Sequence, residues 1–523
     1  MELGALICKP NNPLCHECPI SKNCISFVKK DFKITKNNKK NIDKYLILKV
    51  YKKDKKYLLI KNTKFNFLKN LRIFPMKELS KPKNFNENLN YKMSNMNMNI
   101  KIKYLKSDKK LPYSYWVDQK KFNNHMLPTF TKKNCKIPGK NLMKRIAIIG
   151  AGISGLFIAN LFKKNSNYQV TVYEKNKSID MQEGYGIQLS VNSVKLLNKI
   201  GFSSLQEEDK FTPEKIDFYS SNIAKICELN ISDFNTPECK YTTLKRSVLI
   251  SLLKNGLPNN LIKTDFSISK IDQKNQYTKV FFENNEIIEC DYLIISDGVF
   301  SKSKSLISNY QNKPRYSNTL AIRGILTKAP ENISNKNISL FFDSNFHHVI
   351  YPLNESGYFN FIAIMKHQLT IEEQDNYSLF TENTFIEKII NKIPKNKKKI
   401  FKNLKEVKFF PVFISENFCK LKNKNIHLIG DAFFAFSPTF AQGASQSIEG
   451  AYELFKSIES NAESSFLQNR VKKIKMVNNR SKFNQFIFHL SNPLTAFLRN
   501  LFLKRLVKNK KFLESYLGKI YRD

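Results

Sequence analysis

The sequence is poor in several residue types, and each scarcity limits its interpretation. Of 523 residues only 16 are glycine and one is tryptophan, while 44 acidic side chains stand against 87 basic ones. Only ten of the basic residues are arginine. Lysine spread over both halves, beside abundant asparagine, isoleucine and phenylalanine, is more typical of an A/T-rich genome than of a dedicated DNA-binding surface. The net charge of +43 therefore assigns no function by itself.

Long apolar runs are also lacking. The longest apolar stretch, from Ile146 to Phe162, is interrupted by three glycines and does not form the continuous segment that a membrane span needs. The first residues lack the pattern of a secretory signal peptide, so we expect a cytoplasmic protein. With 41% hydrophobic content, a chain of this length predicts two or three domains with cores of their own.

A glycine-rich turn marks the beginning of the larger part of the chain. An apolar strand pattern runs into Gly150, Gly152 and Gly155, which form a G-x-G-x-x-G motif before an apolar helix. Glycines there let backbone amides at a helix N-terminus approach a pyrophosphate. Glu174 follows the next strand pattern, where a carboxylate can accept both hydroxyl hydrogens of an adenosine ribose. FAD and NAD both meet these conditions.

Two later strand patterns end in an aspartate beside a glycine. Asp297 precedes Gly298, and Gly430 precedes Asp431. A carboxylate next to glycine can approach a sugar hydroxyl or a pyrophosphate closely, because glycine has no side chain to hold the ligand away. Each pair alone is a common turn, and their order after the glycine-rich motif makes the set specific.

The whole set, from Met143 to Asp523, resembles the class A flavoprotein monooxygenases, which include p-hydroxybenzoate, salicylate and ubiquinone-pathway hydroxylases. The resemblance implies an α/β fold in which a Rossmann-like FAD-binding domain is interleaved with an antiparallel substrate sheet, at roughly 214–230 and 315–412. It implies FAD as cofactor, NAD(P)H as a transient co-substrate, and hydroxylation of a small aromatic or quinone-like substrate with O2. On the motifs that match, FAD contacts are expected from Gly150, Gly152, Ser154, Gly155, Glu174, Arg246, Asp297, Gly298, Gly430, Asp431, Pro438, Gly443, Ala444 and Ser445.

The sequence departs from the family at three of these motifs. Phe434 stands where many members have histidine, Ser445 where asparagine is usual, and Lys304 where arginine commonly ends the Asp-Gly motif. None of the changes removes the FAD site. The lysine puts nicotinamide handling in doubt, because that motif is thought to serve both FAD and NAD(P)H.

Catalytic candidates lie in the expected substrate sheet. His347, His348 and Tyr351 are candidates for orienting or deprotonating a phenolic substrate, since a neutral imidazole can take a proton near pH 7. A histidine on a strand is more often an exposed or hydrogen-bonded residue, so a structural role is the alternative.

Four cysteines near the N-terminus form the other candidate site. Cys8, Cys15, Cys18 and Cys24 are close enough in sequence for one loop to bring four thiolates around a centre. A disulfide is disfavoured in a reducing cytoplasm, and zinc ribbons usually pair two C-x-x-C units, of which only one occurs here. We therefore predict a 4Fe-4S cluster held by residues 1–30.

The cysteine spacing and its flanks resemble the iron–sulfur loop of the endonuclease III and adenine DNA glycosylase family. The resemblance implies a small α+β Nudix-like domain at 43–133, followed by a linker at 134–142. In that family the catalytic region precedes the cluster, and only seven residues precede Cys8 here. We therefore expect that this part excises no base and that weak DNA binding is its remaining activity. The sequence leaves open whether the N-terminal part and the flavin part form a functional fusion or result from read-through of two genes.

The last candidate feature is the segment from Phe486 to Lys511, where apolar and cationic residues alternate at roughly helical spacing. A helix lying on a membrane surface and a helix packed on the flavin domain both fit this pattern. Peripheral membrane contact therefore stays open, and the sequence does not define an oligomeric state.

Three classes of function compete. The first is an aromatic hydroxylase, the second a flavin-dependent reductase, oxidase or halogenase on the same fold, and the third an 8-oxoguanine or DNA-binding repair module. The halogenase loses support because its W-x-W-x-I-P signature is absent and Trp116 is the only tryptophan. FAD-dependent hydroxylation is the function that the sequence favours.

Overall fold

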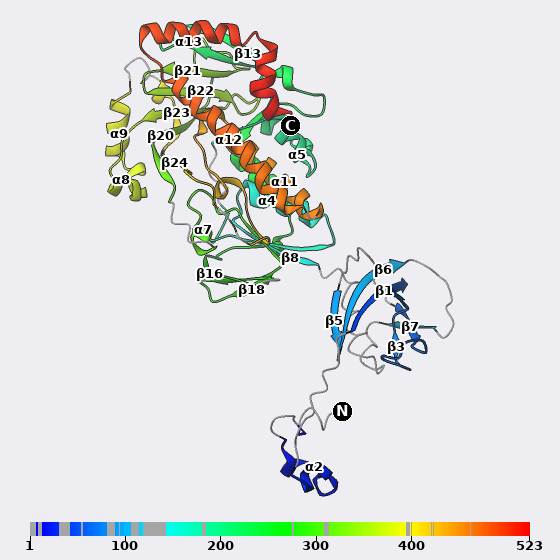
Figure 1. Ribbon diagram of the computed structural model, residues 1–523. Helices are drawn as coiled ribbons and strands as arrows, with labels where there is room; N and C mark the ends of the chain where they lie inside the picture. The colour runs from blue at the N-terminus through cyan, green and yellow to red at the C-terminus, as the bar shows by residue number, and fades with distance from the viewer. Residues whose placement is uncertain are drawn as a thin grey trace. The chain divides into compact units, whose positions relative to one another are not determined.

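The computed structural model divides into two compact units, residues 1–141 and 142–523. Figure 1 shows the ribbon of each unit. The predicted linker at 134–142 lies outside the described residues. The structure describes residues 7–8, 13–30, 42–53, 56–80, 89–93, 95–105, 114–118, 143–179, 185–274, 277–307, 313–393, 398, 400–419, 421, 423–460 and 462–522.

In its described residues, the first unit has three short helical turns and a mixed sheet. The turns are η1 (Cys15–Glu17), η2 (Ser21–Asn23) and α2 (Ile25–Val28). The sheet has the order β3-β2-β1-β6-β5, with β4 paired to β1 and β7 to β2, and β1 and β6 run parallel. Its strands are β1 (Ile42–Lys53), β2 (Lys56–Lys61), β3 (Arg72–Ile73), β4 (Met76–Leu79), β5 (Leu89–Met93), β6 (Met96–Leu105) and β7 (Ser114–Asp118).

Alternating apolar residues build the core of this sheet. Leu46, Leu48 and Val50 point to one face of β1 and are buried there, as the two-residue period of a strand requires. Every regular element in the described residues between 42 and 118 is a strand. The expected helical component of an α+β domain is therefore not found among them, and the Nudix-like interpretation stays a prediction.

The second unit is organised around a parallel sheet of five strands in the order β15-β9-β8-β19-β25. Buried apolar runs form its central strands, as expected for a parallel sheet covered on both faces. The helices α4 (Ile153–Lys163) and α11 (Gly443–Ser460) pack against each other and share one hydrophobic core with the sheet. The strands are β8 (Lys144–Ile149), β9 (Tyr168–Tyr173), β15 (Ile262–Lys263), β19 (Tyr292–Ile295) and β25 (Ile426–Leu428).

A second large sheet has seven strands in the order β13-β12-β21-β22-β23-β20-β24. Its strands are β12 (Lys215–Tyr219), β13 (Lys225–Asn230), β20 (Arg315–Leu326), β21 (Ile338–Asp343), β22 (Phe346–Pro352), β23 (Phe359–Lys366) and β24 (Lys405–Ile414). The expectation of a purely antiparallel sheet is wrong at one pair, because β12 and β21 run parallel. Parallel neighbours need a long crossover, and the intervening chain returns through the parallel sheet before β21 begins.

Smaller elements connect the two large sheets. A three-stranded sheet of β10 (Gly186–Leu189), β14 (Thr242–Lys245) and β11 (Lys210–Phe211) precedes α6 (Arg246–Asn255), and another is formed by β16 (Ile268–Gln273), β17 (Thr278–Phe282) and β18 (Ile287–Cys290). The remaining helices on the described chain between these strands include α5 (Val191–Asn198), α7 (Lys302–Ile307), α8 (Ile371–Asp375) and α9 (Asn383–Asn391).

The C-terminal helices cover one end of the second unit. The long helix α12 (Glu463–Phe488) is followed by α13 (Pro493–Leu506), which contacts β13 at the edge of the seven-stranded sheet (Figure 1). The chain then forms α14 (Lys510–Leu513), a π-helical turn η11 (Glu514–Gly518) and α15 (Lys519–Tyr521). Among the described helices, none is both long enough and apolar enough to pass through a bilayer.

Candidate functional site

A cavity of about 1110 Å³ lies within the second unit. It joins the ends of strands in the parallel sheet to one face of the seven-stranded sheet, the place where open α/β sheets bind ligands. Eight residues expected to contact FAD line it: Gly152, Ser154, Arg246, Gly298, Asp431, Pro438, Gly443 and Ala444. The strands of the other sheet contribute Ile216, Phe218, Leu340, His347, Val349, Tyr351 and Ile362.

The glycine-rich turn follows β8 closely. Gly150 has a φ of +101°, and a Cβ built there would lie 2.6 Å from the carbonyl oxygen of Ser296. A Cβ at Gly155 would meet the carbonyl of Gly150 and the hydroxyl of Ser296. Both glycines are therefore required by close packing between the turn and β19, and α4 can begin directly at the end of the strand.

Glu174 fixes the same turn from the next strand. Its Oε2 accepts a hydrogen bond from the Ala151 amide at 2.8 Å, and its Oε1 accepts one from the Asn176 amide at 3.1 Å. An ionised carboxylate can accept about four hydrogen bonds. Acceptor positions therefore remain for the hydroxyls of a ribose that lies against the turn.

Three glycines of the cavity wall leave open space beside them. A Cβ on Gly152, on Gly298 or on Gly443 would meet no protein atom within 4 Å. Gly152 is the N-cap of α4, and Gly443 is the first residue of α11. Two helix N-termini, each with amides not bonded within the helix, therefore face free space along the cavity wall.

Asp297 supplies an unsatisfied buried acceptor. Its Oδ2 accepts a hydrogen bond from the Ser303 amide at 3.2 Å, whereas its Oδ1 is buried without a hydrogen-bond partner among the described atoms. A buried carboxylate oxygen without a donor is costly. Asp297 does not itself line the cavity, so it shapes the turn beside Gly298, which does. The open space along Gly152 and Gly443 is what fits a cofactor with a pyrophosphate, such as FAD.

Asp431 lines the cavity with a carboxyl whose pKa is perturbed. Its side chain is accessible from the cavity but otherwise surrounded by protein, and this desolvation raises the pKa of Asp431 to about 6, while Lys304 and Arg246 oppose the rise. Burial lowers the pKa of Lys304, and Asp297 and Asp431 counteract this change. The lysine found in place of the family's arginine thus interacts electrostatically with both aspartates.

Six of the expected FAD contacts do not line the cavity. Ser445 is fully buried. Its hydroxyl shares a 3.0 Å hydrogen bond with the Ser193 hydroxyl and accepts a 3.0 Å hydrogen bond from the Ser190 amide. It joins α11 to α5 rather than facing the cavity. The other five form or support the turns around it: Gly150, Gly155, Glu174, Asp297 and Gly430.

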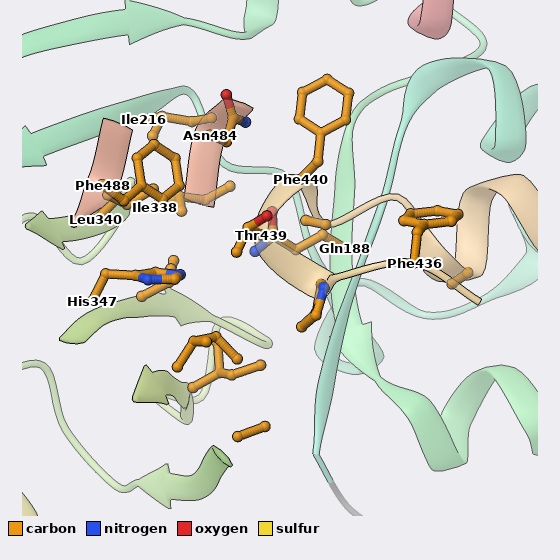
Figure 2. Close-up of a pocket in the computed structure, with 18 of the residues that line it drawn as sticks. Gln188, Ile216, Ile338, Leu340, His347, Phe436, Thr439, Phe440, Asn484 and Phe488 are labelled. Atoms are coloured by element: carbon orange, nitrogen blue, oxygen red, sulfur yellow. The ribbon is translucent and has the colours of Figure 1, made fainter. Parts of the chain in front are cut away.

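His347 lies on the cavity side of β22. Its Nδ1 shares a 2.8 Å hydrogen bond with Nε2 of His489, the residue that ends α12. Burial, followed by His489 and His348, lowers the pKa of His347 well below its usual value, so its imidazole is neutral at neutral pH. Figure 2 shows His347 and Leu340 across the pocket from the 3-10 turn η10 (Pro438–Phe440), which carries Thr439 and Phe440.

His348 is directed away from the cavity, because successive residues of a strand point to opposite faces. Its ring stacks on Phe341 with centroids 4.4 Å apart and packs near Phe361 in a separate apolar core. The structure therefore does not bring His348 to the cavity with His347 and Tyr351.

Tyr351 belongs to a polar cluster that the sequence alone did not reveal. Burial raises the pKa of Tyr351, while Arg323 and a hydrogen bond with Gln188 oppose the rise. The hydroxyl of Tyr241 donates to Oε1 of Gln188 at 2.7 Å. No sequence pattern described above marks Gln188, Tyr241 or His489.

The N-terminal cysteines do not form a comparable site. Among the described residues, no three or more side chains of histidine, cysteine, aspartate or glutamate are placed to hold a metal ion. Cys15 has a raised pKa from desolvation and from the nearby thiols of Cys24, Cys8 and Cys18, so the four cysteines are neighbours. The predicted 4Fe-4S cluster nevertheless receives no support from their arrangement, and the glycosylase-like interpretation stays a prediction.

Comparison with known proteins assigns the second unit. A family model described as an FAD binding domain matches residues 143–465. The chain is 26% identical over 186 residues to 6-hydroxynicotinate 3-monooxygenase of Pseudomonas fluorescens, covering 35% of this chain and 47% of that protein. Salicylate hydroxylase of Pseudomonas putida is 25% identical over 188 residues, covering 35% of this chain and 43% of that protein. The chain thus spans about half the length of these curated relatives.

Solved structures show the same fold. The crystal structure of Klebsiella pneumoniae HpxO complexed with FAD and uric acid superposes with a TM-score of 0.62, over 72% of this chain and 96% of that one. Sequence identity across this match is 16%, so the likeness extends to the fold alone. The α/β fold expected from the sequence is confirmed, and its substrate sheet is mixed where an antiparallel sheet was expected.

Proposed function

Since the chain belongs to the FAD-binding-domain family, we propose that it is an FAD-dependent monooxygenase that hydroxylates a small aromatic or quinone-like substrate, using O2 and NAD(P)H. The observation that carries this proposal is a cavity in which two open helix N-termini meet a buried, apolar sheet face. A redox cofactor and an organic substrate can then share one enclosed space. The names of the relatives, both monooxygenases of hydroxylated aromatic acids, agree with it.

The nucleotide side of the cavity has the groups that FAD needs. Glu174 would accept ribose hydroxyls, the first amides of α4 would bind the pyrophosphate, and Asp431 would accept from the ribityl chain. Gly443 and Ala444, at the start of α11, would lie along the flavin ring. FAD, when bound there, supplies the redox chemistry by which one oxygen atom of O2 is transferred.

The substrate side would bind and orient the aromatic ring. Apolar side chains such as Leu340, Val349 and Ile362 exclude water from that face, which protects a reactive site from side reactions. His347 is neutral and within the same wall, so its free nitrogen can hold or accept a phenolic proton. Its hydrogen bond with His489 would fix the orientation of its ring.

The test is substrate-stimulated consumption of nicotinamide cofactor. Purified full-length protein loaded with FAD would be screened against phenols and hydroxylated aromatic acids, with NADH and NADPH assayed separately. We expect a subset of these compounds to accelerate nicotinamide oxidation and to appear as hydroxylated products. Oxidation of nicotinamide that no aromatic compound accelerates, with no new product, would instead assign a flavin reductase or oxidase.

A further inference from the structure

The cavity opens to solvent between two helices of the C-terminal region. Phe483 and Phe486 on α12, and Leu498 and Phe502 on α13, all line the cavity. Each is also exposed, by 54%, 63%, 42% and 61% respectively. Side chains that both line a cavity and meet solvent surround its mouth, so this mouth is bounded by large apolar groups.

The apolar surface continues outward along α13. Leu494, Phe497 and Leu501 do not line the cavity and are exposed by 67%, 64% and 44%. Their spacing of three and four residues places them on one face of the helix, whereas Arg499 is buried on another face. We refer to Phe483, Phe486, Leu494, Phe497, Leu498, Leu501 and Phe502 together as the apolar rim.

Such a rim is unusual for a surface that faces only water. Soluble proteins rarely expose large contiguous apolar patches, and such patches commonly mark binding surfaces. The polar side chains near the rim have one sign of charge. No aspartate or glutamate occurs between residues 464 and 513. Lys504 and Arg505 in the last turn of α13, and Lys508 just after it, are exposed cations.

We propose that the apolar rim docks on the surface of an anionic phospholipid bilayer, with the cationic residues of 504–511 contacting lipid headgroups. Apolar side chains inserted at the level of the headgroups, beside lysine and arginine, are the chemistry by which interfacial helices bind membranes. The contact is peripheral, because no described helix could cross the bilayer.

Docking in this way would open the cavity mouth toward the lipid phase. This geometry assigns the substrate to a class of molecules dissolved in the membrane, namely an oxidisable aromatic or quinone-like ring that carries a hydrocarbon tail. The substrate assignment rests on the proposed function. The ring would enter past Phe486 and Phe502 toward His347, while the tail remains in the apolar mouth and the bilayer.

Vesicle flotation tests the docking without any turnover. Full-length protein with FAD would be floated with vesicles of phosphatidylcholine alone or of phosphatidylcholine and phosphatidylglycerol in equal parts. We expect binding to the anionic vesicles, and a loss of affinity of roughly tenfold or more in the double variant Phe497→Ser/Leu501→Ser. The matched control is Ile287→Ser/Ile371→Ser, which removes exposed apolar side chains elsewhere and should bind as the unmodified protein does.

Charge reversal separates the electrostatic contribution to vesicle binding from the contribution of the apolar side chains. Lys504→Glu/Arg505→Glu should abolish the preference for anionic vesicles, whereas Lys388→Glu/Lys392→Glu on and just after α9 should retain it. Equal binding to both vesicle types, binding unaffected by Phe497→Ser/Leu501→Ser, or no binding at all would overturn the proposal. A concentration-dependent dimer that this same double variant dissociates would overturn it as well, by assigning the rim to a second copy of the chain.

Turnover then tests the substrate class. Phe497→Ser/Leu501→Ser should oxidise nicotinamide with a water-soluble phenol at the unmodified rate, because neither residue lines the cavity. With a phenol carrying a long alkyl chain in anionic vesicles, its rate should fall roughly tenfold, in line with its weaker binding. Equal rates on the vesicle-bound phenol would overturn the substrate assignment, and absence of turnover with either phenol, while flotation succeeds, would count against the monooxygenase proposal alone.

Discussion

The two sides of the cavity are built by different means. On the nucleotide side, short stretches of chain place backbone amides and glycines, as at Gly152 before α4 and Gly443 at the start of α11. On the substrate side, Ile216, Leu340 and His347 come from three strands that are brought together by sheet pairing. The first side depends on local conformation and the second on the register of distant strands. Mutations should therefore act on them in separable ways.

Blocking the space beside Gly152 should have the largest effect. Gly152→Val adds a side chain where a Cβ meets no protein atom, in an extended conformation that valine adopts readily. The FAD-free protein should melt at an unchanged temperature, while FAD affinity falls by about 10³-fold because the pyrophosphate cannot approach α4. Fluorescence titration with FAD measures the affinity. Unchanged FAD binding would show that the cofactor lies elsewhere.

Replacing His347 should affect the opposite side. In His347→Gln we expect kcat to fall by roughly 10²-fold while FAD affinity is retained, since the lost group is a proton acceptor on the substrate wall. His489→Gln is the matched variant, because it removes the hydrogen-bond partner and leaves His347 in place. If both variants lower the melting temperature equally and leave kcat unchanged, the histidine pair has a structural role only.

Asp431→Asn separates charge from shape on the nucleotide side. The pKa of Asp431 is raised from 3.8 to about 6 by desolvation, so its ionisation costs stability as the pH rises through about 6. Without FAD, the variant should gain roughly 1 kcal/mol of unfolding free energy at about pH 8, after allowance for solvent in the cavity, and nothing below about pH 4. FAD affinity should fall roughly tenfold.

Denaturant unfolding at the two pH values measures this difference. A gain of stability that is equal at both pH values would contradict the assignment of the cost to the ionised carboxylate. The FAD titration is carried out on the same samples, so that loss of cofactor and gain of stability are compared in one variant.

The smallest expected effect is on the polar cluster of the substrate side. Tyr241→Phe removes the hydroxyl that donates to Gln188 and should lower the unfolding free energy by about 1 kcal/mol. With Gln188 less firmly oriented, KM for the aromatic substrate should rise a few-fold and kcat should change little. A large fall in kcat would mean that Tyr241 takes part in the reaction itself.

The same contrast explains how much could be predicted from the sequence. Gly150, Gly155 and Glu174 were identifiable because the conformation of the turn demands glycine and a nearby carboxylate, and these demands are local. Asp297 and Asp431 followed from the same kind of motif. Eight of the predicted FAD contacts line the cavity, whereas Ser445 packs against α5 and does not face it.

The substrate side was predictable only as a set of strands. Strand alternation determines that His347 and His348 point to opposite faces, but which face meets the cavity is decided by packing against α12 and the neighbouring sheet. The partnership of His347 with His489 joins residues 142 positions apart, and the Tyr241–Gln188 contact joins residues 53 positions apart. No local pattern encodes such pairs.

The most direct test of the central proposal is the fate of molecular oxygen. With FAD, nicotinamide, an aromatic substrate that stimulates turnover and ¹⁸O₂, the hydroxylated product should gain one ¹⁸O atom for each nicotinamide oxidised, as mass spectrometry would show. A product oxidised without the label, or hydrogen peroxide formed in place of product, would contradict monooxygenation in this cavity.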